Sequence, residues 1–409
     1  MKSDIDRYME EAGLQALFVV GAAAGNPPMV YFTGLVHLGY AELIKKRGEP
    51  PVLFCQPMER DEAARTGLQT RDVSDYNPIR LLQESEGDYT RALATRYTRM
   101  LQEYGVRGRV ALYGKANVGA AYAVFQQVQE NLPEIEVIGE SDQRSVLTRA
   151  RATKDADEVE RIRQMGQKVV GIAGEVQEFL TSHRVQDGVL VNREGDPLTI
   201  GEVKRRINLW LALRGGDNPE GMIFAIGRDA GVPHSAGTDE ASVEVGKTII
   251  LDFYPCEPAG GYFYDFTRTW CLGYAPEEVQ EVFEDVRQAY ESAIASLKPG
   301  MPCRDAQNLV CKEFEAKGHP TVLTDPNTKE GYVHSLGHGV GLAIHEGPGF
   351  IGLETNTDVL PSGAVVAIEP GLYYPDRGFG VRLEDTVWVR PDGRVEILAE
   401  FPKDLVLKV

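Results

Sequence analysis

The stretch HSLGHGVGLAIHE, residues 334–346, contains three of the seven histidines in this 409-residue chain. Its three glycines argue against a helix, because each exposes backbone and adds conformational freedom that folding must remove. His334 and His338 are four residues apart, as in a helical HExxH zinc site, but Ser335 stands where the glutamate belongs. The histidines are therefore either incidental in a glycine-rich loop or part of a site completed elsewhere in the chain.

The composition is that of an ordinary soluble globular protein, with 43% hydrophobic and 25% charged residues. The net charge of −18 disfavours nucleic-acid and anionic-membrane partners, although solubility alone also explains the acidity. The chain shows no apolar run long enough for a membrane span. Five cysteines without a CxxC pair favour a reduced, cytoplasmic location.

The first 150 residues alternate apolar runs with polar helical stretches, which predicts an α/β domain. This part contains neither GxGxxG after a strand nor a GKS/T phosphate loop, so we expect no nucleotide site. We place a domain boundary near residue 150, with a second domain over 151–409. The expected strands are 16–21, 51–57 and 109–114, and the expected helices are 58–67 and 88–104.

Three helices are predicted early in the second domain. Apolar residues from Val159 to Phe179 recur at steps of three and four, which indicates one long amphipathic helix. Thr199 and Glu202 form a capping-box pattern that opens a second helix. A third begins at Pro276 and runs to Leu297. Residues 183–197 read as a turn-rich polar segment.

Two aspartates are expected on neighbouring strands. TIILDFYPCEPAGGYFYDFTRTW, residues 248–270, reads as strand, turn and strand, which places Asp252 roughly opposite Asp265. Like charges so placed repel unless a cation lies between them. The alternative is that one or both point to solvent, for which Asp265, between Tyr264 and Phe266, is poorly placed.

Two glutamates follow in apolar surroundings. An apolar strand over 364–374 carries Glu369, which is hard to explain as solvated surface. A further strand over 379–389 places Arg382 and Glu384 two residues apart and so on one face. A local Arg382–Glu384 ion pair is an equal alternative for that segment.

Two aspartates, two glutamates and at least one histidine within one region are more simply ligands for a pair of divalent metals than separate accidents. Four carboxylates balance two dications. An oxygen-rich set with one imidazole suits Mn²⁺, Co²⁺ or Zn²⁺ rather than a thiolate site. We predict two divalent ions per chain, with Mn²⁺ as the first choice.

The sequence motifs GHGVGLAIHE, IEPGLYY and RLEDT resemble those of the pita-bread metallopeptidases, which include prolidase and aminopeptidase P. The resemblance covers residues 230–390 strongly and the first 150 residues, similar to the extra domain of these enzymes, more weakly. It implies an α/β N-terminal domain followed by an α+β pita-bread catalytic domain. The order of the implied ligands is Asp252, Asp265, His338, Glu369 and Glu384.

The resemblance also implies roles for these residues. Asp252 would bind one metal, His338 and Glu369 the other, and Asp265 and Glu384 would bridge them. His234, His334, His345 and Arg382 match substrate-side positions. Catalytic roles fall to His345 and His234, which would donate to the developing oxyanion, and to Glu369, which would move the proton of a metal-bridging hydroxide or water.

The implied activity is exopeptidase hydrolysis of Xaa-Pro bonds in short proline-containing peptides by a cytoplasmic homodimer. Alternatives are an aminopeptidase P or carboxypeptidase-like enzyme on longer peptides, a non-catalytic peptide-binding protein, and a metal-free amidinohydrolase resembling creatinase. Two features depart from the family pattern. Asp252 and Asp265 lie 13 residues apart instead of the usual eleven or so, and 183–197 looks like an insertion. Tyr254 stands where glycine is common, and the longer hairpin leaves the end-group preference open.

Overall fold

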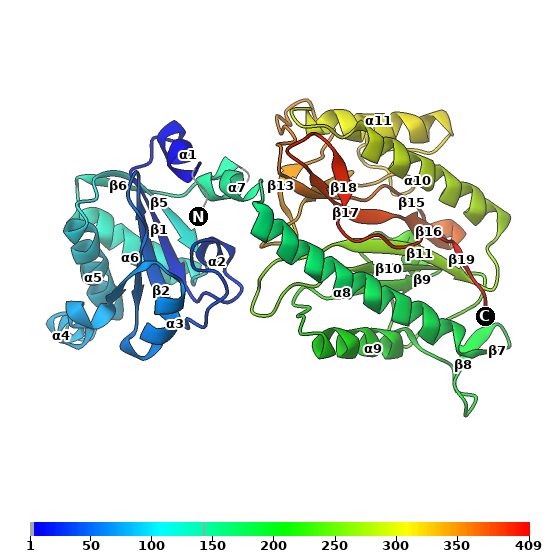
Figure 1. The fold of residues 1–409 in the computed structure, drawn as a ribbon, viewed down its shortest axis with the longest axis horizontal. Helices are drawn as coiled ribbons and strands as arrows, with labels where there is room; N and C mark the ends of the chain where they lie inside the picture. The colour runs from blue at the N-terminus through cyan, green and yellow to red at the C-terminus, as the bar shows by residue number, and fades with distance from the viewer. Residues whose placement is uncertain (1–3, 142–143) are drawn as a thin grey trace. The chain divides into compact units, whose positions relative to one another are not determined.

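The computed structural model describes residues 4–141 and 144–409, and the chain divides into two compact units (Figure 1). The first unit is Met1–Arg151 with Ala259–Gly261, and the second is Ala152–Pro258 with Tyr262–Val409. Each unit is built around its own β-sheet. The short segment 259–261, at the turn of the predicted aspartate hairpin, groups with the first unit.

The first unit contains a six-stranded mixed sheet in the order β4-β3-β2-β1-β5-β6. β1 coincides with the predicted strand at 16–21, and the strands expected at 51–57 and 109–114 are confirmed as β3 and β5. The strands are β1 (Ala16–Gly21), β2 (Ala41–Lys46), β3 (Val52–Cys55), β4 (Gln69–Asp72), β5 (Gly108–Gly114) and β6 (Ile135–Ile138).

Helices cover both faces of this sheet, and β1 is therefore buried along its whole length. Leu17 and Val19 belong to one apolar cluster, whereas Phe18 and Val20 belong to another, as the alternation of side chains along a strand requires. The helices are α1 (Ile5–Glu11), α2 (Pro27–Thr33), α3 (Arg60–Arg65), α4 (Pro78–Glu84), α5 (Tyr89–Glu103), α6 (Val118–Asn131) and α7 (Val146–Arg151).

The second unit contains a nine-stranded sheet whose main path runs β13-β12-β14-β17-β11-β10-β9, with β18 on β17 and β19 on β11. Pairing along the main path is antiparallel. The strands are β9 (Met222–Ile226), β10 (Thr248–Phe253), β11 (Phe266–Leu272), β12 (Gly337–Gly339), β13 (Glu346–Gly349), β14 (Val365–Ile368), β17 (Glu384–Val389), β18 (Val395–Ile397) and β19 (Val406–Leu407).

The three helices expected in this unit are present as α8 (Ala156–Thr181), α9 (Ile200–Leu213) and α10 (Glu277–Ser296), joined by α11 (Cys303–Ala316). Asp155 and Glu158 form a full capping box at the start of α8. Apolar residues of α10 and α11 share one core cluster with β14 and β17. Within the described ranges, no helix is long and apolar enough to cross a membrane.

Three predicted segments differ in detail. Residues 183–197 contain a hairpin, β7 (Arg184–Gln186) and β8 (Val189–Val191). The single strands expected at 364–374 and 379–389 are each divided, because β15 (Gly371–Tyr374) and β16 (Phe379–Arg382) form a sheet of their own. Pro370 separates β14 from β15, and proline cannot donate a ladder hydrogen bond.

Candidate metal centre

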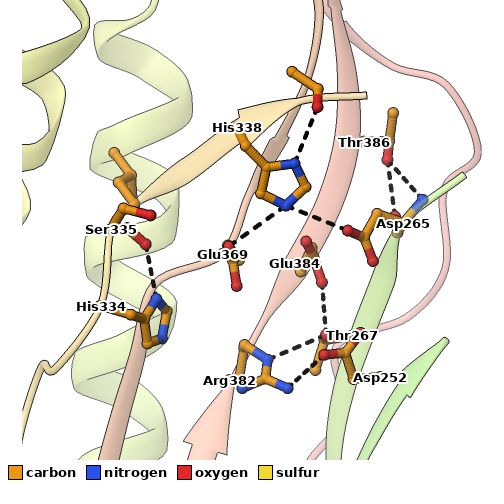
Figure 2. Close-up of polar contacts among 12 residues, drawn as sticks. Asp252, Asp265, Thr267, His334, Ser335, His338, Glu369, Arg382, Glu384 and Thr386 are labelled. Carbon is orange, nitrogen blue, oxygen red and sulfur yellow. Dashed lines mark hydrogen bonds and ion pairs between the residues drawn. The ribbon is translucent and has the colours of Figure 1, made fainter. Parts of the chain in front are cut away.

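The predicted metal ligands come from five strands that are consecutive in the sheet, in the order β12, β14, β17, β11 and β10. Asp252 lies in β10 and His338 in β12. Asp265 directly precedes β11, Glu369 directly follows β14, and Glu384 is the first residue of β17. Figure 2 shows Asp265, His338, Glu369 and Glu384 pointing toward one another. The sheet thus gathers distant parts of the sequence at one place.

His338 presents a lone pair to acidic oxygens. Its Nε2 lies 3.5 Å from Asp265 Oδ2 and 3.7 Å from Glu369 Oε1 (Figure 2). Its Nδ1 lies 3.1 Å from the carbonyl oxygen of Gly339, which can only accept, so Nδ1 carries the ring proton. Burial, with a further contribution from His345, lowers the pKa of His338 to about 4. The neutral ring therefore repels these oxygens unless a cation lies between them.

The carboxylates of the cluster are buried together. Burial, followed by repulsion from neighbouring carboxylates, raises the pKa of Asp265 and of Glu384 well above the ordinary values. Burial raises the pKa of Glu369 to about 8, although the Arg382 guanidinium opposes this. Asp252 Oδ1 is buried and finds no hydrogen-bond donor among the residues described. The four carboxyl groups of Asp252, Asp265, Glu369 and Glu384 are therefore accompanied by too little positive charge, since Arg382 pairs with Asp252.

The donor atoms of Asp265, His338 and Glu384 that could bind a metal all lie within 4.8 Å of one another. Oxygen ligands with one imidazole suit a hard or borderline divalent cation. Nδ1 of a metal-binding histidine is commonly held by a backbone carbonyl, as it is here by Gly339. The residues therefore fit a divalent metal ion.

The two aspartates are not directly opposite each other. The partner of Asp252 across the ladder is Thr267, and Asp265 lies two residues earlier. The prediction of roughly opposite aspartates was therefore offset by two residues. Both carboxylates still reach one face, because side chains two apart along a strand point the same way. Thr267 itself donates from Oγ1 to Glu384 Oε2 over 2.6 Å.

Arg382 pairs with Asp252 rather than with Glu384. Its Nη2 donates to Asp252 Oδ2 over 2.6 Å, and its Nη1 donates to Tyr373 Oη over 2.7 Å. Arg382 ends β16, whereas Glu384 begins β17 in the other sheet, so the two residues do not share one strand face. The alternative of a local Arg382–Glu384 pair is wrong for this physical reason. The guanidinium is 2% exposed.

His334 ends a chain of hydrogen bonds that begins at Arg382. His334 Nδ1 lies 2.7 Å from the carbonyl oxygen of Ser335 and therefore carries the proton. His334 Nε2 then accepts from Tyr373 Oη over 2.8 Å. Burial lowers the pKa of His334 to about 3, with Arg382 contributing in the same direction. His334 is thus a neutral ring held in one orientation.

His345 and His234 are exposed, in contrast to the buried cluster. The His345 ring lies 4.3 Å from the His338 ring, measured between centroids. Burial of part of the ring lowers the pKa of His345, and the charge of His234 adds to this effect. Of the predicted substrate-side histidines, His345 therefore lies beside the candidate ligand His338, and His234 is exposed and close enough to His345 to influence its pKa, whereas His334 is partly buried.

The glycines of the opening stretch serve strand packing. A Cβ at Gly337 would lie 1.9 Å from the carbonyl oxygen of Ala367 in β14, and one at Gly339 would lie 2.2 Å from that of Gly347. β12 lies between β13 and β14 in the sheet. These glycines therefore permit the close approach of neighbouring strands.

Sequence reasoning missed three supporting residues. Tyr373 connects Arg382 to His334, Thr267 bonds Glu384, and Thr386 Oγ1 donates to the backbone oxygen of Asp265 over 2.8 Å. The signal available for the threonines was their position two residues after a candidate ligand, in DFT and EDT. Tyr373 had no such signal, because it follows no candidate ligand at that spacing. Its partners Arg382 and His334 meet it only in the folded chain.

The profile of metallopeptidase family M24 matches residues 161–391, which include every candidate ligand. The chain belongs to this family. The chain therefore has the two-part pita-bread fold of this family, and the predicted family resemblance and fold class are confirmed.

The chain spans about half the length of the first curated relatives that it matches. The chain is 31% identical to the uncharacterized peptidase YqhT of Bacillus subtilis over 206 residues, 50% of this chain and 54% of that protein. It is 32% identical to the Xaa-Pro dipeptidase of Pyrococcus furiosus over 193 residues, 47% of this chain and 51% of that protein.

A solved structure extends the likeness in fold to nearly the whole chain. The X-Pro aminopeptidase of Thermotoga maritima superposes with a TM-score of 0.74 at 23% identity, covering 98% of this chain and 100% of that one.

Proposed function

We propose that this protein is a dinuclear metal-dependent exopeptidase that hydrolyses Xaa-Pro bonds in short peptides. The observation that carries the proposal is the buried cluster in which a neutral His338 Nε2 faces the oxygens of Asp265 and Glu369. Two divalent cations would relieve this repulsion and supply the partner that Asp252 Oδ1 lacks among the described residues. The family supports divalent-metal chemistry in general.

Asp252, Asp265, His338, Glu369 and Glu384 would hold the two cations. Mn²⁺ is the first candidate and Co²⁺ and Zn²⁺ are alternatives, because the set is rich in oxygen and has one imidazole. Bound divalent cations supply Lewis acidity, which lowers the pKa of water and polarises a carbonyl group. Four carboxylates balance the charge of two dications.

Glu369 is the proposed proton carrier. Its side chain is 18% exposed, more than those of Asp265 and Glu384, so it can reach both the cluster and a bound peptide. Burial raises its pKa to about 8 in the metal-free site, and a bound cation would favour the carboxylate, the form that can accept a proton. Glu369 would take a proton from the attacking water and deliver it to the leaving nitrogen.

His345 and His234 are proposed to bind the substrate oxygen. Both imidazoles are exposed, with His345 beside His338 and His234 near His345, so each could donate to the scissile carbonyl as its charge develops. Arg382 is better suited to hold Asp252 than to grip a substrate carboxylate, because its donors already contact Asp252, Tyr373 and Thr267. Through Tyr373 it also orients His334, so its effect on substrate is indirect.

The proline preference is motivated by the family resemblance and by the related Xaa-Pro dipeptidase. An amide with proline nitrogen has no N–H, so a site for it needs an apolar wall rather than an acceptor. A dipeptide substrate, a homodimer and a cytoplasmic location complete the proposal. The five cysteines are buried and free, as expected in a reducing compartment.

Hydrolysis of Ala-Pro, Ala-Pro-Ala and Ala-Ala by the Mn²⁺-loaded protein tests this proposal. We expect Ala-Pro to be cleaved well and Ala-Ala poorly. Equal rates for Ala-Ala would contradict the proline preference. A much faster tripeptide would assign the protein to the aminopeptidase P group. Metal analysis of the purified protein separates all of these from a metal-free hydrolase or a non-catalytic binding protein.

A further inference from the structure

A buried ion pair lies next to His345 in the chain. Lys154 Nζ is 3.1 Å from Glu346 Oε2, and each side chain is 1% exposed. Placing two charges in the interior costs desolvation free energy, and an apolar pair of similar volume is often at least as stable. Stability alone is therefore a weak reason for this pair, and its position suggests a second role.

The Glu346 carboxylate holds the loop 341–346 closed. Its Oε1 accepts from the backbone N–H of Ala343 over 3.1 Å, and the N–H of Gly341 donates to the carbonyl oxygen of Ala343 over 3.1 Å. A Cβ at Gly341 would lie only 2.4 Å from Glu346 Oε2, so the carboxylate packs directly on the loop backbone. Loop and carboxylate form one compact unit.

Lys154 joins this loop to a rigid part of the fold. Its backbone N–H donates to the carbonyl oxygen of Gly363 over 2.8 Å, and Thr153 forms a β-bridge with Ala364, just before β14. The next residue, Asp155, caps α8. The ammonium group therefore extends from a backbone that is fixed at both α8 and β14.

Glu346 directs its neighbour His345. Glu346 is the first residue of β13 and is buried, whereas His345 lies in the bend just before the strand and is exposed. With Glu346 turned inward to Lys154, His345 is turned outward, where its ring lies 4.3 Å from that of His338. We propose that the Lys154–Glu346 pair is a positioning device that holds His345 over the candidate metal centre. This inference deepens the proposed function and rests on it.

The test replaces both charges together, because a single replacement would leave one buried charge without a partner. In Lys154→Met/Glu346→Leu we expect kcat for Ala-Pro to fall about 10-fold to 100-fold, as a small misplacement of a catalytic group can cause. Bound Mn²⁺ should be unchanged. The matched control is Arg96→Met/Glu42→Leu, which removes a buried pair of the first unit and should leave kcat within twofold.

A double-mutant cycle separates positioning from a general structural role. If the pair acts through His345, replacing it in a His345→Ala background should lower kcat no further than twofold. Loss of the same factor in both backgrounds would overturn the inference. Should the double replacement fail to fold, Lys154→Met/Glu346→Gln keeps the size of residue 346 and the acceptor for Ala343 while removing both charges, and the same non-additivity is required of it.

Hydrogen exchange gives a readout that needs no activity. Peptides covering 340–347 should exchange at least tenfold faster in Lys154→Met/Glu346→Leu than in wild type, and unchanged in the control pair. Unchanged exchange in this loop would refute the positioning role. If the wild-type protein with Mn²⁺ cleaves no peptide, the proposed function fails, whereas the exchange result still shows whether the pair fixes the loop.

Discussion

The sheet of the first unit and the candidate metal centre of the second unit bury carboxylates in different ways. In the first unit, Glu42 of β2 lies against Arg96, and Tyr97 Oη donates to it over 3.2 Å. Burial raises the pKa of Glu42, and Arg96 opposes the rise. In the second unit, four of the candidate ligands have carboxylates that lie near one another. Arg382 forms an ion pair with only one of them, Asp252. The comparison teaches that buried acids paired within the chain support structure, whereas acids left in excess mark a cation site.

Metal removal should separate the two sheets most strongly. Dialysis against a strong chelator should abolish peptide hydrolysis, and Mn²⁺ or Co²⁺ should restore it. Because the candidate ligands lie in the second unit, hydrogen exchange should accelerate in peptides of β11, β12 and β14 and stay constant in those of β1 and β2. Full activity in metal-free protein, shown by elemental analysis, would contradict the metal assignment.

Glu369→Gln should have the next largest effect. The amide cannot accept a proton, so we expect kcat to fall about 10²–10⁴-fold, the usual contribution of general acid–base catalysis. The fold should be retained, as circular dichroism would show, with much of the metal still bound. The control is Glu354→Gln at an exposed position. A Glu369→Gln rate within twofold of wild type would mean that another residue carries the proton.

Arg96→Met tests the opposite side of the comparison. Leaving Glu42 buried without its guanidinium partner should lower the free energy of unfolding of the first unit by about 3–5 kcal/mol. Hydrogen exchange in β2 would measure this, and the Mn²⁺ affinity should not change. Arg80→Met, which removes an exposed pair with Glu84, should cost at most about 1 kcal/mol. A change in Mn²⁺ affinity with Arg96→Met would couple the two sheets and break the comparison.

The smallest effect concerns the pH dependence of the metal-free protein. A carboxyl whose folded pKa is raised stabilises the fold below its ordinary pKa of 4.5, and this is lost as the pH rises through about 8 for Glu369. His338, with its pKa lowered from 6.5 to about 4, contributes constant stability above pH 6.5. Between pH 6.5 and 8, wild type should therefore lose more stability than Glu369→Gln, as thermal unfolding would show. Equal slopes would contradict the raised pKa.

Many elements could be predicted from local sequence. The strand at 16–21 and the helix at 156–181 follow from runs and periods of apolar residues, which depend only on neighbours in the chain. The chemistry of the candidate centre was visible in the same way. An acid beside apolar residues, such as Glu369 after Val-Val-Ala-Ile, is anomalous in any fold.

Sequence by itself determined which residue types could bind a cation and the order in which they occur. Only the tertiary structure decided how they meet. It set the two-residue offset of Asp252 and Asp265 and the division of residues 379–389 between two sheets. It also decided that Arg382 pairs with Asp252. The pairing of Lys154 with Glu346 belongs to the same class. Strand register and long-range ion pairs depend on which segments become neighbours when both faces of the sheet are buried, and a local pattern carries no information about that choice.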